Sequence, residues 1–304
     1  MPRCCAEHAT ASRATEVIPV TRHAPCLRNP PWKYSALNNP LNVKSDQLSS
    51  DGFDALSKVP QITIAFWIVK VLATTLGETG GDALSMTLNL GYAVSTLIFL
   101  AFFIVTLVMQ VGSKHYHPVL YWAVVVATTT VGTTTSDYFD RTLGLGYVKS
   151  SAILFSLVLL VLVIWRYTTG AIAADHITTR KNEIFYWMTI LVSNTLGTAL
   201  GDFVADTSGI GFEKGALVFA VLIAIVAALH FFTDLPEAVL FWAAYVLTRP
   251  LGATLGDTLT KPHVQGGLNL GRFTSSFVMA VAMVLIIALS RLRHRVPKPE
   301  AAPA

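Results

Sequence analysis

The sequence predicts an all-α fold: a polytopic transmembrane helix bundle with eight spans, arranged as four parallel two-helix repeats. Of the 304 residues, 53% are hydrophobic and only 13% are charged, whereas a soluble domain carries about a quarter charged residues. The apolar residues gather in runs of about 18 or more, the length of a membrane-spanning helix. A Trp-centred motif also occurs four times, which indicates an internally repeated fold.

The motif has the same spacing in every copy. A glycine lies ten residues after each Trp, and an aspartate lies five residues beyond that glycine. Successive copies are 55, 65 and 55 residues apart, which indicates duplication of one unit followed by duplication of the pair. The aromatic-Trp pairs are Phe66-Trp67, Tyr121-Trp122, Tyr186-Trp187 and Phe241-Trp242, and the aspartates are Asp82, Asp137, Asp202 and Asp257.

Each copy predicts two helices joined by a turn rich in Gly and Thr. The first helix begins before the Trp and ends around the aspartate, and the second is more uniformly apolar. The membrane domain is expected at 59–290. Its repeats are predicted at about 60–111, 117–165, 183–232 and 236–290.

The flanking segments differ in composition. Residues 1–58 are polar and predict a disordered N-terminal tail without a signal peptide, or else a start codon assigned too early; 291–304 form a basic C-terminal tail. Cys4, Cys5 and Cys26 all lie in the first tail, which excludes a disulfide framework or a thiolate metal site in the membrane.

The charge distribution predicts the orientation. An even number of helices per copy makes the copies parallel and puts both termini on one side. Ten basic residues lie near helix ends on that side and five on the other, so the positive-inside rule predicts cytoplasmic termini and aspartate turns that face outward. The small net charge of +4 argues against a nucleic-acid partner.

A polar stripe follows one face of each first helix. It occupies positions 3, 7, 11, 15 and 19 after each Trp, which share a face because a helix turns once in about 3.6 residues. A charge at the bilayer centre costs about 2.5–3.5 kcal/mol, so these side chains are expected to face a shared polar centre. The acids are Glu78, Asp82, Asp137, Asp202, Asp206 and Asp257, the bases are Lys70, Arg141, Arg249 and Lys261, and the neutral members include Thr74, Thr129 and Asn194.

Six acids against four bases predict a net acidic pathway or binding site for a cation. Carboxylates and hydroxyls are hard ligands, so a hard metal ion or a cation exchanged for protons is the leading substrate. The candidate metal ligands are Glu78, Asp82, Asp137, Asp202 and Asp257.

Other functions stay open. The carboxylates could instead cap helix ends and fix packing, Lys70 and Arg249 could bind the anionic group of a small organic solute, or the protein could be a scaffold or sensor without transport. No enzymatic motif occurs, so the chain is predicted not to be an enzyme and to need no cofactor. The Trp residues are expected in an interfacial aromatic belt, and the glycines at packing or turn positions.

The segment from Lys70 through Leu-Gly-Glu-Thr-Gly-Gly-Asp82 to Leu-Asn-Leu-Gly-Tyr92 resembles a family of bacterial integral membrane proteins with four tandem "repeats of unknown function". The resemblance covers about 58–292. It implies two transmembrane segments per repeat, a location in the bacterial cytoplasmic (inner) membrane, the lipid bilayer as partner and no established activity. It leaves the oligomeric state open. The fourth copy departs from the others with Arg249-Pro250 and a longer turn.

Overall fold

The computed structural model describes residues 59–113, 115–170, 172, 177 and 179–295. Within these ranges the chain forms eight α-helices and no strand, which confirms the predicted all-α fold. Each predicted helix is present, with ends a few residues from those expected. The helices are α3 (Ile64–Asp82), α4 (Gly91–Gly112), α5 (Pro118–Asp137), α6 (Tyr147–Thr169), α7 (Arg180–Asp202), α8 (Phe212–Phe232), α9 (Glu237–Thr260) and α10 (Arg272–Arg295).

The whole predicted N-terminal tail, residues 1–58, lies outside the described residues, as do residues 296–304. Helix α10 continues to Arg295, so the first five residues of the predicted C-terminal tail are helical.

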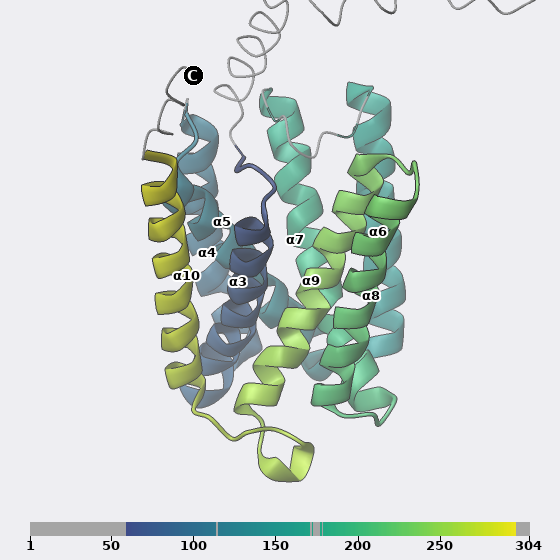
Figure 1. Cartoon of the computed structure of the whole chain (residues 1–304). Coiled ribbons are helices and arrows are strands. Elements are labelled where there is room, and N and C mark those ends of the chain that lie inside the picture. The colour runs from purple at the N-terminus through teal and green to yellow at the C-terminus, as the bar shows by residue number, and fades with distance from the viewer. Residues whose placement is uncertain (1–58, 114, 171, 173–176, 178, 296–304) are drawn as a thin grey trace, which may run out of the picture. The chain divides into compact units, whose positions relative to one another are not determined.

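The helices form two layers (Figure 1). In the inner layer α3 packs against α5, α5 against α7, α7 against α9, and α9 against α3, which makes a closed ring. The most apolar part of α7 is 72% buried and that of α9 is 61% buried, against 22% for α4 and 11% for α10. The polar first helices of the four copies are therefore inside, and the apolar second helices are outside.

The outer helices are placed with a cyclic offset. Each outer helix packs against the inner helix of the following copy, so that α4 covers α5, α6 covers α7 and α8 covers α9. The last outer helix, α10, covers α3 and closes the circle. Each copy thus supplies an inner helix at one position of the ring and the outer helix that covers the next position.

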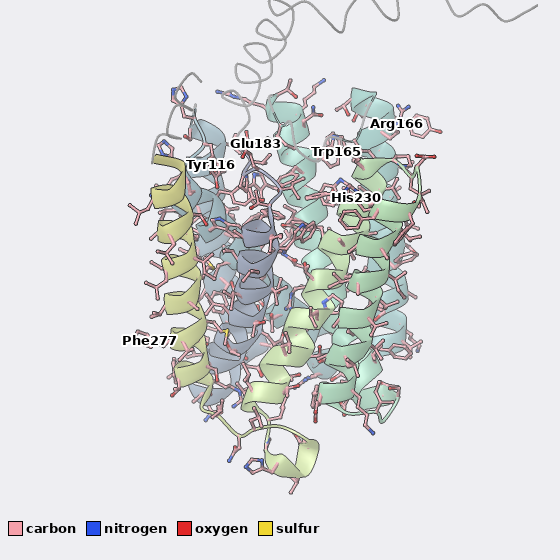
Figure 2. The ribbon with its side chains drawn as sticks, viewed as in Figure 1. Tyr116, Trp165, Arg166, Glu183, His230 and Phe277 are labelled. Atoms are coloured by element: carbon pink, nitrogen blue, oxygen red, sulfur yellow. The ribbon has the colours of Figure 1, made fainter. Side chains whose placement is uncertain are left out.

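Of the eight described helices, six are long and apolar enough to cross a membrane: α4, α6, α7, α8, α9 and α10. The other two, α3 and α5, are more polar. Helix α3 carries Lys70, Glu78 and Asp82, and α5 carries six threonines. On the outer layer large apolar side chains are exposed, and Phe277 of α10 points away from the bundle (Figure 2). These helices identify a membrane protein.

Glycine allows the inner helices to touch. The glycine ten residues after each Trp faces the next inner helix so closely that an added Cβ would overlap its neighbour. This confirms the expected packing role of these glycines. In cyclic order the contacts are Gly77 with Thr129, Gly132 with Asn194, Gly197 with Arg249, and Gly252 with Thr74.

The turns after the aspartates differ from the prediction. Instead of ending, α3, α5 and α7 each continue into one π-helical turn, at Ala83–Thr87, Tyr138–Thr142 and Phe203–Thr207, whereas α9 runs on to Thr260. Gly91, the first residue of α4, and Gly146 and Gly211, which precede α6 and α8, take positive φ angles of 75°, 76° and 84°, which favour glycine. The structure thus confirms them as turn positions.

Candidate functional site: a buried polar column

The polar stripe lies inside the inner ring. In all four copies the residues 3, 7, 11 and 15 positions after the Trp are at most 3% exposed. Four-residue steps rise about 6 Å along a helix, so these positions form successive layers down the axis of the ring. We call this set of side chains the polar column.

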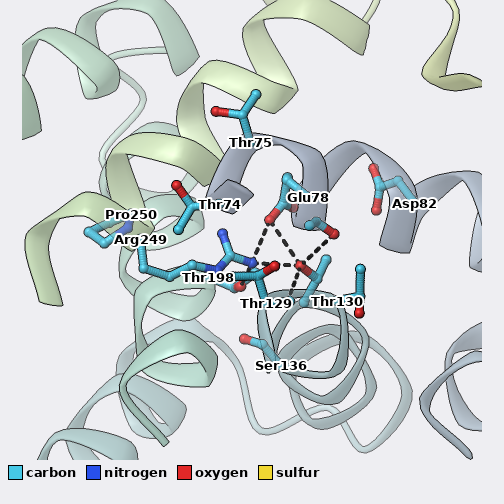
Figure 3. A network of polar contacts seen from close by, with 12 residues as sticks. Thr74, Thr75, Glu78, Asp82, Thr129, Thr130, Ser136, Thr198, Arg249 and Pro250 are labelled. Carbon is cyan, nitrogen blue, oxygen red and sulfur yellow. Dashed lines mark hydrogen bonds and ion pairs between the residues drawn. The ribbon is translucent and has the colours of Figure 1, made fainter. Parts of the chain in front are cut away.

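Arg249 occupies the middle of the polar column. Its Nη2 is 2.9 Å from Oε2 of Glu78 and donates to the hydroxyls of Thr133 (2.5 Å) and Thr198 (2.6 Å). Figure 3 shows the guanidinium between Glu78 and Thr198. Because its acceptors belong to α3, α5 and α7, this one side chain of α9 connects all four inner helices.

Lys70 lies one layer nearer the Trp end. Its side chain is 0% exposed, and its Nζ has no hydrogen-bond partner in the described part of the chain. The ammonium lies 4.1 Å from the centroid of the Tyr245 ring, a cation–π contact. Among the described residues, Lys70 therefore has an aromatic neighbour but no counter-ion.

The neutral members of the stripe mostly hold helices together. Thr74 donates to the carbonyl of Thr248 and Thr129 to that of Ala73, both at 3.2 Å between neighbouring inner helices. Their hydroxyls thus already serve helix packing. Asn194 differs, because its amide nitrogen donates to Thr128 while its Oδ1 has no partner among the described residues.

The four motif aspartates converge at the far end of the polar column. Each is 1–3% exposed and lies at the end of an inner helix. Three basic side chains form ion pairs with them. The ion pairs are Arg141 with Asp137 (3.2 Å) and Asp202 (3.4 Å), Lys261 with Asp257 (3.4 Å) and Asp82 (4.0 Å), and Arg272 with Asp82 (3.4 Å).

Two of these bases, Lys261 and Arg141, lie in the turns that follow inner helices. Burial disfavours the charged form of Lys261, but the carboxylates of Asp257 and Asp82 outweigh it and keep the pKa of the ammonium above its ordinary value. In the same way burial opposes the charge of Arg141, and the neighbouring aspartates still raise the pKa of its guanidinium.

The structure corrects two details of the predicted site. Asp206 is exposed, because the π-helical turn at Phe203–Thr207 rotates it away from the interior, so it does not join the buried aspartates. Arg272, which the stripe did not include, reaches Asp82 from the start of outer helix α10. Together with the three bases that pair with its aspartates, the polar column has five acids and five bases, so the predicted acidic excess is wrong. The bases are Lys70, Arg141, Arg249, Lys261 and Arg272.

The buried Asp140 belongs to a separate small cluster. Its carboxylate accepts hydrogen bonds from the hydroxyls of Ser136 and Ser150. Burial raises the pKa of Asp140, and the two hydroxyls oppose that rise. In the part of the chain that the structure describes, no group of three or more His, Cys, Asp or Glu side chains could hold a metal ion.

Aromatic side chains fill the other end of the inner ring. Trp122, Trp187 and Trp242 are 2–6% exposed, so the predicted lipid-facing belt is wrong for them. Each Trp packs on the aromatic residue that precedes the Trp of the previous copy. We call these contacts the aromatic ring; they are Phe66 with Trp122 (5.6 Å between centroids), Tyr121 with Trp187 (5.5 Å), Tyr186 with Trp242 (5.8 Å) and Phe241 with Trp67 (5.8 Å).

The fold and the polar column together define a helical membrane protein with four cyclically packed copies of one motif. The chain belongs to the family described as Repeat of Unknown Function (DUF347), whose pattern matches residues 65–116, 120–176, 185–235 and 240–295. Each matched range takes in an inner helix and the outer helix after it. This confirms the resemblance that the motifs indicated. Comparisons with curated proteins and with solved structures find no match to the chain.

Proposed function

We propose that the protein is a secondary transporter or channel that moves a cation along the axis of the inner ring. The observation that supports this most is the gathering of the four buried motif aspartates at one end of a closed ring of helices, with a fifth buried carboxylate, Glu78, one layer further in. A membrane protein rarely buries charges away from a functional pathway, because each is costly to insert.

The proposed arrangement has eight spans, formed by four parallel two-helix repeats in the bacterial cytoplasmic membrane. Helices α3 and α5 are the two inner spans whose polarity is shielded by the other helices. The termini lie in the cytoplasm and the aspartates face outward. Arg166 and Glu183 then lie toward the cytoplasm, at the end opposite the aspartates (Figure 2).

In this proposal Arg141 and Lys261 act as resident counter-charges. A cation that enters between the aspartates takes the place of these side chains, each of which bridges two carboxylates at 3.2–4.0 Å. The described conformation is closed at both ends, by these ion pairs and by the aromatic ring. Transport then requires the two ends to open in turn.

Ion flux into proteoliposomes tests the proposal, with protons and a hard divalent metal ion as separate arms. Asp82→Asn combined with Asp202→Asn is expected to abolish flux, because both carboxylates lie in the buried cluster. Asp206→Asn is the matched control, since the exposed Asp206 is expected to leave flux unchanged. Unchanged flux in the double variant would contradict the assignment of the aspartates.

Two other functions make different predictions. A transporter of a small organic solute is favoured by the unpaired Lys70 and predicts stabilisation by organic anions. A scaffold or sensor predicts no flux, together with a partner that crosslinks to residues 1–58. The proposed function involves no catalysis.

A further inference from the structure

The middle of the polar column carries more positive charge than negative. Lys70 and Arg249 lie there with one acid, Glu78, whose Oε2 already accepts from Arg249 and Thr133. The two basic side chains lie in adjacent layers of the column, and Nζ of Lys70 is 4.1 Å from the ring centroid of Tyr245, one helical turn before Arg249. This region therefore differs from the aspartate end, where four acids face three bases.

Unpaired hydrogen-bond donors occur on three side chains in two adjacent layers of the column. Within the described ranges, Nζ of Lys70, Nε and Nη1 of Arg249 and the hydroxyl of Tyr245 have no hydrogen-bond partner. All three side chains are 0% exposed. Tyr245 and Arg249 lie four residues apart on one face of α9, and Lys70 comes from α3, which packs against α9.

These groups select a ligand by charge and by hydrogen bonding. Lys and Arg side chains donate only, so the ligand has to supply acceptors. A cation would find no free carboxylate to hold it at this layer, because Glu78 already pairs with Arg249. An anion would pair with Lys70 and satisfy donors whose burial is otherwise costly.

We infer that Lys70, Arg249 and Tyr245 form a binding site for a small monovalent anion, either a halide or the carboxylate of a small organic solute. The site is separate from the aspartate end. It goes beyond the proposed cation transport and does not depend on it, because it is defined by equilibrium binding.

Thermal unfolding of the detergent-purified full chain tests the site. Chloride, nitrate and acetate are titrated at constant ionic strength against a sulfate reference. At least one of the three is expected to raise Tm in a saturable way. A response to chloride and nitrate assigns a halide-type ligand, and a response to acetate assigns a carboxylate. The absence of saturable stabilisation by all three would overturn the inference.

Two lysine variants locate the site. Lys70→Met is expected to weaken anion binding by about tenfold or more, because it removes a charged hydrogen-bond donor. Lys149→Met is the control, since the exposed Lys149 of α6 is expected to leave anion binding unchanged. Full anion binding by Lys70→Met would contradict the assignment.

A third variant keeps the test independent of folding. Tyr245→Phe retains the ring beneath Lys70 and removes only the hydroxyl, so it is expected to fold and to bind the anion several-fold more weakly. Equilibrium dialysis of wild type with radiolabelled chloride or acetate measures binding directly. Anion binding without cation flux would reject only the proposed function, and cation flux without anion binding would reject only this site.

Discussion

The two ends of the inner ring are made from the same motif but are closed in different ways. In the aromatic ring each copy supplies an equivalent contact, at 5.5–5.8 Å between centroids, so the closure has fourfold character. At the other end each copy supplies an aspartate, but only the second and fourth copies supply the base on the stripe. Arg141 and Lys261 each pair with the aspartate of their own copy and that of the next.

The comparison shows that residues used for packing and residues that carry charge differ in how they are repeated among the four copies. Packing residues, such as the aromatic pairs and the glycines between inner helices, are kept in all four copies. The bases 19 residues after the Trp, Arg141 and Lys261, occur only in the second and fourth copies, as expected if two copies were duplicated together. This gives the aspartate end twofold character. The middle has no symmetry, because Lys70, Glu78 and Arg249 each occur in one copy only.

The largest expected effect is at this asymmetric middle. Arg249→Met leaves the Glu78 carboxylate buried without a cation, which should cost about 3–5 kcal/mol of unfolding free energy. Chemical denaturation in detergent micelles measures this change. The exposed Arg166 provides the control, and Arg166→Met should change stability by less than about 0.5 kcal/mol.

The double variant Arg249→Met/Glu78→Gln separates the ion pair from simple loss of packing. Removing both charges should recover most of the lost stability, because neither charge is then left buried alone. A double variant as unstable as Arg249→Met would show that the pair is not the cause.

The fourfold packing can be broken at a single glycine. Gly77→Ala puts a Cβ against the side chain and backbone of Thr129 and should destabilise the protein by about 1–3 kcal/mol through overpacking. Gly80→Ala, in the same helix, is the matched control because the nearest atoms to its Cβ are 3.9–4.0 Å away. The control should be neutral or stabilising, since alanine favours a helix over glycine by about 1 kcal/mol. Equal melting temperatures for the two variants would contradict the close approach.

A hydrogen bond sharpens the comparison inside the aromatic ring. The hydroxyls of Tyr121 and Tyr186 lie 2.6 Å apart, whereas the corresponding residues of the other two copies are phenylalanines. Tyr186→Phe should cost about 1–3 kcal/mol, because the Tyr121 hydroxyl is left unpaired. The double variant Tyr121→Phe/Tyr186→Phe should be closer to wild type. Additive losses in thermal melts would argue against a shared bond.

The smallest expected effect is the pH response of the aspartate end. The pKa of Lys261 is higher in the folded protein than in the unfolded chain, so its contribution is complete below the ordinary lysine value of about 10.4 and is lost as the pH rises above it. Wild type should therefore lose stability in strongly alkaline buffer. Lys261→Met should show less of this loss, and Lys149→Met as much as wild type. Identical melting profiles for Lys261→Met and wild type would count against the ion pairs of Lys261.

Much of the architecture could be predicted because two strong rules act on it. The helical period fixed the face on which the stripe lies, and the cost of charge in a membrane required that face to point inward. Both rules apply to single helices, so they work without knowledge of neighbours. Lys70, Glu78 and Arg249 were found in this way.

The remaining features depend on neighbours or on local geometry. A Trp near a helix end suits a lipid interface as well as a protein interior. The burial of Trp187 could therefore not be predicted without knowing that it packs on Tyr121 of the previous copy. Asp206 was misplaced because a four-residue step fails across a π-helical turn, while the longer side chain of Arg141 still reaches Asp202 from the equivalent position. Arg272 was missed because it comes from an outer helix.

The cyclic offset of the outer helices removes the ends that a linear array of repeats would expose. Stacked repeats need specialised caps at both termini, but α10 seals α3 here as α4 seals α5. A circularly permuted chain that begins at α5 and finishes at α4 would therefore keep each of these helix contacts. A chain shortened by one copy would instead leave an inner helix uncovered.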